Sequence, residues 1–311
     1  TYKNFKIMLK INSCDQSEFL PALGGIKCAN KMMVGFNLIR RDVRIDLSTF
    51  DKDALDELIE TGKWIGYLEP FQKENANQDA QYATSVQGQR SQKVKAIKGW
   101  SFTFDEGNCF NNEMEKLNNS RLWSFAPVLE DGSIILNQFS DGKAGGFESN
   151  LFTGVFDLPL TADVSGSQLM VDLTPKGSRD WATNSILVSA LDFQFDEITP
   201  IKGLRMVLPT VITGVATSVA VNISELCAST VDNFATSTSF TFEVKNNAGV
   251  VTYNAPSAVV QNGNVLTFTV TAFGAGKTVK LVTKNSTSNT YGVAKNNEFY
   301  YYGESNSVIT T

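Results

Sequence analysis

Short stretches in which apolar and polar residues alternate recur along most of this chain, and this pattern constrains its fold most strongly. In residues 43–47 (Val-Arg-Ile-Asp-Leu) and 100–104 (Trp-Ser-Phe-Thr-Phe), every second residue is apolar. Side chains on a β-strand point alternately to its two faces, so this period is typical of a strand with one buried face. Phenylalanine is also frequent, at 21 of 311 residues, and aromatic residues suit a pleated surface. The sequence therefore predicts a mainly β protein, folded as a β-barrel or β-sandwich.

Two segments interrupt the strand pattern and have the spacing of short flanking helices. In residues 50–61, Leu55, Leu58 and Ile59 fall on one helical face, and a serine and an aspartate before them fit an N-terminal cap. Residues 108–118 predict a second amphipathic helix, because their apolar residues recur at i, i+4 and i+7, namely at Phe110, Met114 and Leu117.

The strand pattern changes near residue 203, and we predict two domains. Residues 1–203 contain both helix signals and predict a β-rich assembly domain. Residues 204–311 hold several short β runs at roughly even spacing, with Asn262-Gly263 as a type I′ turn candidate between two of them. This spacing is typical of an immunoglobulin-like β-sandwich, although the Cys…Trp…Cys framework of antibody domains is missing.

Residues 72–95 form a polar arm that differs from the rest of the chain. They are rich in Gln, Asn and Ser and contain almost nothing that could anchor a core. A polar segment of this length inside a compact domain is either functional or disordered. In an assembling protein it would order against a neighbouring subunit. The alternative is a mobile hairpin tip.

Residues that could perform catalysis are scarce. The chain has no histidine, which removes the commonest general base and zinc ligand. The triplet Gly-Lys-Thr at 276–278 resembles the end of a phosphate-binding loop, but Thr271 occupies the position of the required earlier glycine. Asp192, Asp196 and Glu197 are the best remaining candidates for a hydrolase, and nothing in the sequence marks a cleft around them. We therefore predict a protein that is not an enzyme, with no catalytic, cofactor-binding or metal-binding residues.

Other chemically notable side chains are interpreted as structural. The acidic residues of the first helix are expected to form a solvated face: Asp56, Glu57 and Glu60. The four tryptophans sit within or beside apolar strands and are expected in the core: Trp64, Trp100, Trp123 and Trp181. The four cysteines are too sparse for a disulfide scaffold and are expected to be small buried hydrophobes in a chain made in the cytosol: Cys14, Cys28, Cys109 and Cys227.

Charge and hydropathy limit the partners of the chain. The net charge is −5 and no sustained basic stripe is present, so a nucleic acid is not an expected partner. The longest apolar candidate for a membrane span, residues 204–220, is interrupted by Arg205, Pro209 and Gly214. The first residues lack the pattern of a signal peptide, and we expect synthesis in the cytoplasm.

Several pieces of the chain together resemble structural proteins of tailed bacteriophages. They are residues 66–71 (Gly-Tyr-Leu-Glu-Pro-Phe), the polar arm, residues 100–104 with the short helix after them, and residues 123–129 (Trp-Ser-Phe-Ala-Pro-Val-Leu) with their hairpin. The layout is similar to major tail (tube) proteins, which often carry a C-terminal immunoglobulin-like domain. The resemblance covers most of the chain, and its pieces are architectural. It implies a virion component whose partners are copies of itself and other virion proteins.

Two other functions remain open from the sequence. An all-β major or auxiliary capsid protein of the jelly-roll type would have a similar length and composition. A carbohydrate-binding or adhesin module would fit the immunoglobulin-like part and the aromatic residues.

Overall fold

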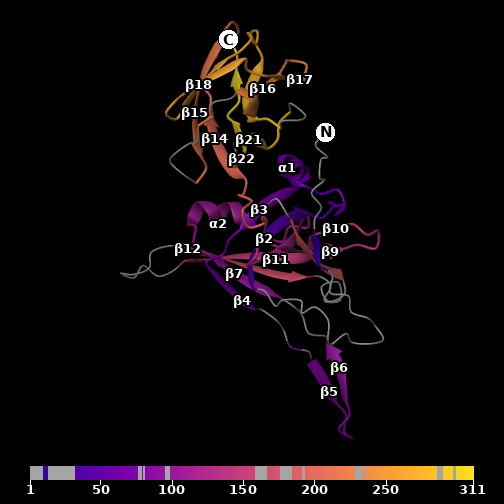
Figure 1. Ribbon diagram of the computed structural model, residues 1–311. Helices are drawn as coiled ribbons and strands as arrows, with labels where there is room; N and C mark the ends of the chain where they lie inside the picture. The colour runs from indigo at the N-terminus through magenta and orange to yellow at the C-terminus, as the bar shows by residue number, and fades with distance from the viewer. Residues whose placement is uncertain are drawn as a thin grey trace, which may run out of the picture. The chain divides into compact units, whose positions relative to one another are not determined.

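The chain forms two compact units (Figure 1). The computed structural model describes residues 10–12, 32–75, 79, 81–94, 99–157, 167–175, 184–190, 193–227, 233–234, 237–285, 290–296 and 299–311. Unit 1 comprises Thr1–Leu55 and Trp64–Ile198, and unit 2 comprises Asp56–Lys63 and Thr199–Thr311. Unit 2 thus includes a short segment from the N-terminal part of the chain.

Unit 1 is built on an 11-stranded sheet in which all the pairings are antiparallel. The sheet branches at β8, which pairs with β2, β9 and β11. Along its main path the strands are β1 (Lys10–Asn12), β13 (Ser185–Ser189), β9 (Ile134–Gln138), β8 (Trp123–Leu129), β11 (Phe147–Asp157), β12 (Ser167–Pro175), β7 (Trp100–Phe104) and β4 (Gln72–Asn75). Off this path lie β2 (Met33–Arg40), β3 (Trp64–Leu68) and β10 (Ala144–Gly145).

The core of unit 1 follows from the alternation seen in the sequence. On β7 the apolar residues Phe102 and Phe104 are buried, whereas the intervening Thr103 is only half-buried. Phe36 of β2 lies 4.9 Å from Phe102, ring centroid to ring centroid, and packs edge-on to Phe104 at 6.2 Å. Buried aromatic pairs of this geometry each add about 0.5–1.5 kcal/mol beyond the area they bury.

Both predicted helices are present, each slightly shorter than predicted. Helix α1 spans Lys52–Glu60 and α2 spans Asn108–Glu115. The Asp51 carboxylate accepts a hydrogen bond from the Ala54 amide at 3.0 Å, which is the expected N-terminal cap of α1. Leu55 and Ile59 are fully buried, as their spacing predicted.

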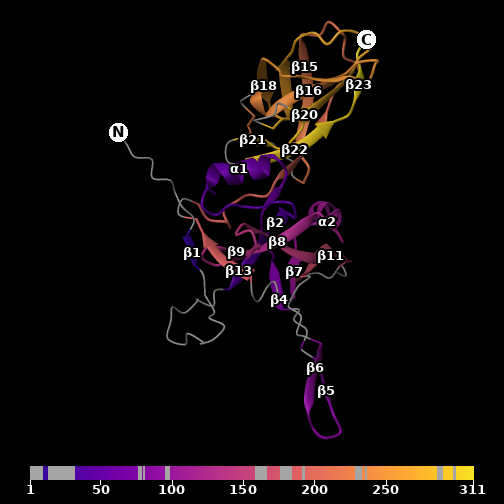
Figure 2. The same ribbon diagram turned by 90° about the vertical axis from the view of Figure 1, so that its right-hand side faces the viewer.

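Unit 2 contains a 10-stranded sheet (Figure 2). One pairing is parallel, between β14 and β22, and the rest of the ladder is antiparallel. The main path runs β17 (Val251–Asn254), β16 (Phe240–Lys245), β20 (Thr278–Thr283), β22 (Phe299–Ser305), β14 (Lys202–Val207), β15 (Ser218–Glu225), β19 (Val265–Thr269) and β18 (Ala258–Asn262). Beside it lie β21 (Ala294–Asn296), β23 (Val308–Ile309) and a 3₁₀ turn at Ser237–Ser239.

The core of unit 2 is a second, separate cluster of apolar side chains. Phe234 packs edge-on against both Phe240 and Tyr301, and Phe268 packs against Phe240 and Phe242. The turn between β18 and β19 has Gly263 and Asn264 at its centre, because Asn262 still pairs with Val265. Gly263 has a positive φ of 57°, whereas Asn262 and Asn264 do not, so the predicted type I′ turn at Asn262-Gly263 is wrong by one residue and in type. The prediction of a mainly β protein of the sandwich or barrel class is therefore confirmed.

Candidate assembly surfaces

The polar arm folds as a hairpin that pairs with neither large sheet. Strands β5 (Gln81–Thr84) and β6 (Arg90–Val94) form a two-stranded sheet of their own, drawn as a separate ribbon in Figures 1 and 2. Among the hairpin side chains that the structure describes, none is buried. Val86 is fully exposed, and Tyr82 is 59% exposed. An isolated two-stranded hairpin is marginally stable at best in water. The described part of the chain adds few contacts that would stabilise this hairpin further.

The first residues of the predicted arm are part of the large sheet of unit 1 and not of the hairpin. Gln72–Asn75 is strand β4, which pairs with Trp100–Phe104 in the sheet of unit 1. The prediction that residues 72–95 form one continuous arm is therefore wrong at its beginning, because these polar residues are paired through their backbone. Their side chains gave no strand signal, since all the described ones are exposed.

Among the described residues, both large sheets end in strands that pair on one side only. β4 ends the path in unit 1, and β17 and β18 end the path in unit 2. The strands in unit 2 carry exposed apolar residues: Val251 is 41% exposed and Val260 is 67% exposed. A row of unpaired N–H and C=O groups is a template for pairing with another chain, and exposed apolar residues along it favour that pairing.

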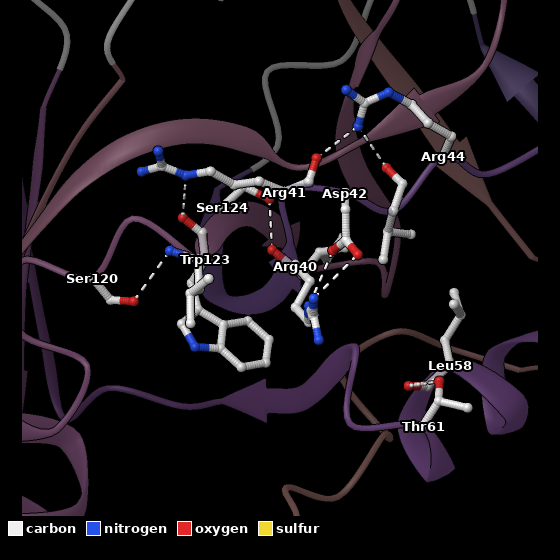
Figure 3. A network of polar contacts seen from close by, with 12 residues as sticks. Arg40, Arg41, Asp42, Arg44, Leu58, Thr61, Ser120, Trp123 and Ser124 are labelled. Atoms are coloured by element: carbon white, nitrogen blue, oxygen red, sulfur yellow. Dashed lines mark hydrogen bonds and ion pairs between the residues drawn. The ribbon is translucent and has the colours of Figure 1, made fainter.

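Figure 3 shows a network of polar contacts around the arginine-rich turn after β2. Arg41 donates to the carbonyl oxygens of Trp123 and Ser149, both at 3.0 Å. Arg44 donates to the Arg41 carbonyl at 2.7 Å, and its guanidinium lies 3.7 Å from the ring centroid of Phe139. The guanidinium groups are therefore bound to backbone oxygens and to a ring, and they hold the turn in place instead of forming an anion site.

Of the acidic residues that the sequence placed on a solvated face of α1, Glu57 is exposed, but Asp56 is only half-buried and Glu60 is buried, so the prediction is wrong for these two. Asp56 accepts a hydrogen bond from the hydroxyl of Tyr300 and forms an ion pair with Lys295. Asn285 donates to the Glu60 carbonyl at 3.0 Å, and Glu60 itself is buried. Burial, followed by the hydrogen bond and charge of Asp56 and the charge of Glu60, raises the pKa of Tyr300. These contacts lie within unit 2 and tie its N-terminal segment to strands β21 and β22.

The carboxylates considered for hydrolysis do not form a site in the part of the chain that the structure describes. Asp192 lies outside the described residues, Asp196 is half-buried and Glu197 is exposed. Burial, and then the charges of Glu69 and Asp196, raise the pKa of Tyr67 to about 12. Within the described ranges, no group of acidic, cysteine or histidine side chains could hold a metal ion.

Two further predictions about single residues can be compared with the structure. The triplet at 276–278 is a turn that leads directly into β20, as the simpler interpretation required. Trp64 is fully buried between the stacked rings of Phe50 and Phe195, so the core interpretation is confirmed for it. The other tryptophans are less buried or undescribed: Trp100 and Trp123 pack beside the core partly buried, and Trp181 lies outside the described residues.

The cysteines differ from the prediction. Cys109 and Cys227 are both disulfide-bonded, and neither is buried. The interpretation of these two as free, buried hydrophobes is therefore wrong, while Cys14 and Cys28 lie outside the described residues. Disulfides persist mainly in secreted proteins and on virion or cell surfaces, where no cytosolic reductant reaches them. The low number of cysteines concealed this, because a sparse set gives no pairing signal.

Comparison with known proteins assigns this chain to no family. No protein-family model matches the chain, and no curated protein matches it. No helix in the described ranges is both long and apolar enough to cross a membrane. The class of this protein is therefore given by its fold alone: it is a mainly β protein with two compact units.

Proposed function

We propose that this protein is a self-assembling structural component of a bacteriophage virion, and that it builds a tail-tube-like particle. The observation that carries the proposal is the β5–β6 hairpin, none of whose described side chains is buried and whose strands pair with no other sheet. A hairpin of this kind becomes stable when a neighbouring copy covers it. The virion setting rests on the architectural resemblance of the sequence.

Open sheet edges supply the second contact that an assembly needs. Backbone groups at the free edges of β4, β17 and β18 can pair with strands of other copies. Repetition of such a contact by a rotation closes a ring and satisfies every edge. Disulfides at Cys109 and Cys227 would suit a particle that works outside the cell.

Negative-stain electron microscopy and light scattering of the purified full chain test the proposal. We expect rings or tubes for the wild type, whereas closed shells would favour a capsid protein. In a deletion variant, a short Gly-Ser linker replaces Gln81–Val94, and we expect it to remain folded and to lose assembly. A strictly monomeric wild type at high concentration would refute the proposal.

Point variants separate the hairpin contact from a general effect of surface changes. We expect Tyr82→Ser with Val86→Ser to weaken assembly, because these are the large exposed apolar side chains of the hairpin. The control is Val215→Ser, which changes a valine that is 81% exposed on a loop of unit 2. Equal assembly by the hairpin variant and this control would show that the hairpin is not the contact.

A further inference from the structure

Polar and aromatic side chains form a row across the outer surface of four strands of unit 2. Glu243 on β16 lies directly opposite Tyr253 on β17 and, on its other side, opposite Lys280 on β20. Glu304 on β22 lies opposite Val282, two residues from Lys280. Because residues two apart share a face of a strand, all these side chains lie on one face of the sheet.

Two more tyrosines extend the row. Tyr302 precedes Glu304 by two residues on β22 and so shares its face. The ring of Tyr291 stacks on that of Tyr302, with centroids 4.9 Å apart and planes at 23°. The tyrosine face, as we name it, is made of Tyr253, Tyr291, Tyr302, Glu243, Glu304 and Lys280. Of the four strands that carry it, β16, β17 and β22 are labelled in Figure 1 and β20 in Figure 2.

The tyrosine face is accessible and its side chains are held in place. Tyr302 is 45% exposed and Tyr253 is 38% exposed. The Tyr253 hydroxyl donates to Glu243 at 3.4 Å, and Lys280 pairs with Glu304 at 2.5 Å. Tyr302 is exposed and stacks on the half-buried Tyr291, and neither ring belongs to the core, which lies on the opposite face of the same strands.

Two tyrosines of the tyrosine face have raised pKa values, as their burial and acidic neighbours require. Burial, then the hydrogen bond and charge of Tyr302 and the charges of Glu304 and Glu243, raise the pKa of Tyr291. Burial and then the charge and hydrogen bond of Glu243 raise the pKa of Tyr253. Tyr291 and Tyr253 therefore keep their protons at neutral pH, and their hydroxyls remain hydrogen-bond donors.

We propose that the tyrosine face binds an oligosaccharide of neutral or amino sugars. A pyranose ring has an apolar C–H face that can stack on a tyrosine ring, and hydroxyls at its rim. Tyrosine suits such a ligand because it combines a rigid apolar body with a polar tip. Carboxylates at Glu243 and Glu304 accept hydrogen bonds from sugar hydroxyls, and Lys280 donates to their oxygens.

The charges on the tyrosine face define which sugars fit. Glu243 and Glu304 are balanced by Lys280 and by Lys284, which lies opposite Tyr291, so this surface carries no net charge to attract a sugar acid. A sugar acid would place a further carboxylate beside Glu243 or Glu304, and like charges brought together weaken binding. Neutral hexoses and amino sugars are therefore favoured over uronic and sialic acids.

An array printed with neutral, amino and acidic oligosaccharides, probed with the full chain, tests the proposal. The best-retained oligosaccharide is then titrated into the wild type and variants by calorimetry. We expect Tyr302→Ala and Tyr253→Ala each to bind roughly five- to tenfold more weakly, as the loss of one stacking contact implies. Glu243→Gln, which keeps the shape of the side chain, is expected to weaken binding less and to relax the exclusion of acidic sugars.

An exposed tyrosine outside the tyrosine face provides a matched control. Tyr82→Ala removes a tyrosine that is 59% exposed on the hairpin, and we expect it to bind like the wild type. Circular dichroism checks that each variant is folded. An array on which the wild type retains no glycan would overturn the proposal, as would unchanged affinity in both folded tyrosine variants. Protection of the tyrosine face only in assembled particles, without glycan binding, would identify it as a protein interface and would also overturn it.

Discussion

Replacing Asp56 with alanine should destabilise unit 2, although this residue lies far from the strands of that unit in the sequence. Its carboxylate accepts from the Tyr300 hydroxyl, and Tyr300 is only 2% exposed. A buried hydroxyl without its acceptor costs about 1–3 kcal/mol. The ion pair with Lys295 is partly exposed, at 35% for the lysine side chain, and adds about 0.2–1 kcal/mol. We expect Asp56→Ala to lower the free energy of unfolding by about 2–3 kcal/mol.

Urea unfolding of the full chain measures this loss, with hydrogen exchange of β20 and β22 peptides reporting on unit 2. Tyr300→Phe alone should cost about 1 kcal/mol. The double variant should cost less than the sum of the two single ones, because both remove the same hydrogen bond.

The matched control is Glu57→Ala on the next position of the same helix. It removes the same charge with a smaller gain in helix propensity than Asp56→Ala, but Glu57 is exposed. We expect a change within about 0.5 kcal/mol. Equal effects of Asp56→Ala and Glu57→Ala would refute the reasoning, since they would show that the buried hydrogen bond contributes nothing.

Three further outcomes are expected. Raising the pH above 10.0 should destabilise the fold, because the pKa of Tyr67 is about 12 in the folded protein and 10.0 in an ordinary tyrosine. Between these two values the unfolded chain loses the proton and the folded chain keeps it, so the stability present below pH 10.0 falls until the pH passes about 12. Urea unfolding at several pH values will measure this fall. Gly303→Ala should prevent the parallel pairing of β14 and β22, because its Cβ would lie 2.2 Å from the Leu204 carbonyl oxygen, and a large loss in melting temperature would show it. Without a reductant, iodoacetamide should label neither Cys109 nor Cys227, and mass spectrometry of the digested chain will detect any adduct.

The features that the sequence determined are those that depend on neighbouring residues. The alternation in residues 100–104 predicted β7, and the apolar spacing at Leu55 and Ile59 predicted α1. Gly263 marked the turn between β18 and β19, because few other residues adopt the positive φ that a tight hairpin needs, although this turn lies one residue later than predicted. Side-chain period and turn geometry are short-range properties, so they can be recognised without knowing the fold.

The candidate surfaces were only partly predictable. The polar composition of residues 72–95 marked the hairpin, because a segment with so few apolar residues cannot anchor a core. The tyrosine face gave no such signal, since Glu243, Tyr253 and Lys280 become neighbours through strand pairing alone.

The tertiary structure decided which distant residues meet, and with that the meaning of several side chains. Asp56 has the sequence context of a solvated helix face, and it is the burial of Tyr300 that makes it a structural residue. Strands β14 and β22 pair although about a hundred residues separate them. Such contacts depend on the burial of the whole chain, and the energy that selects them is spread over many residues. The amino-acid sequence thus determined the elements and their faces, whereas the fold alone decided which of those faces are covered and which are free to bind.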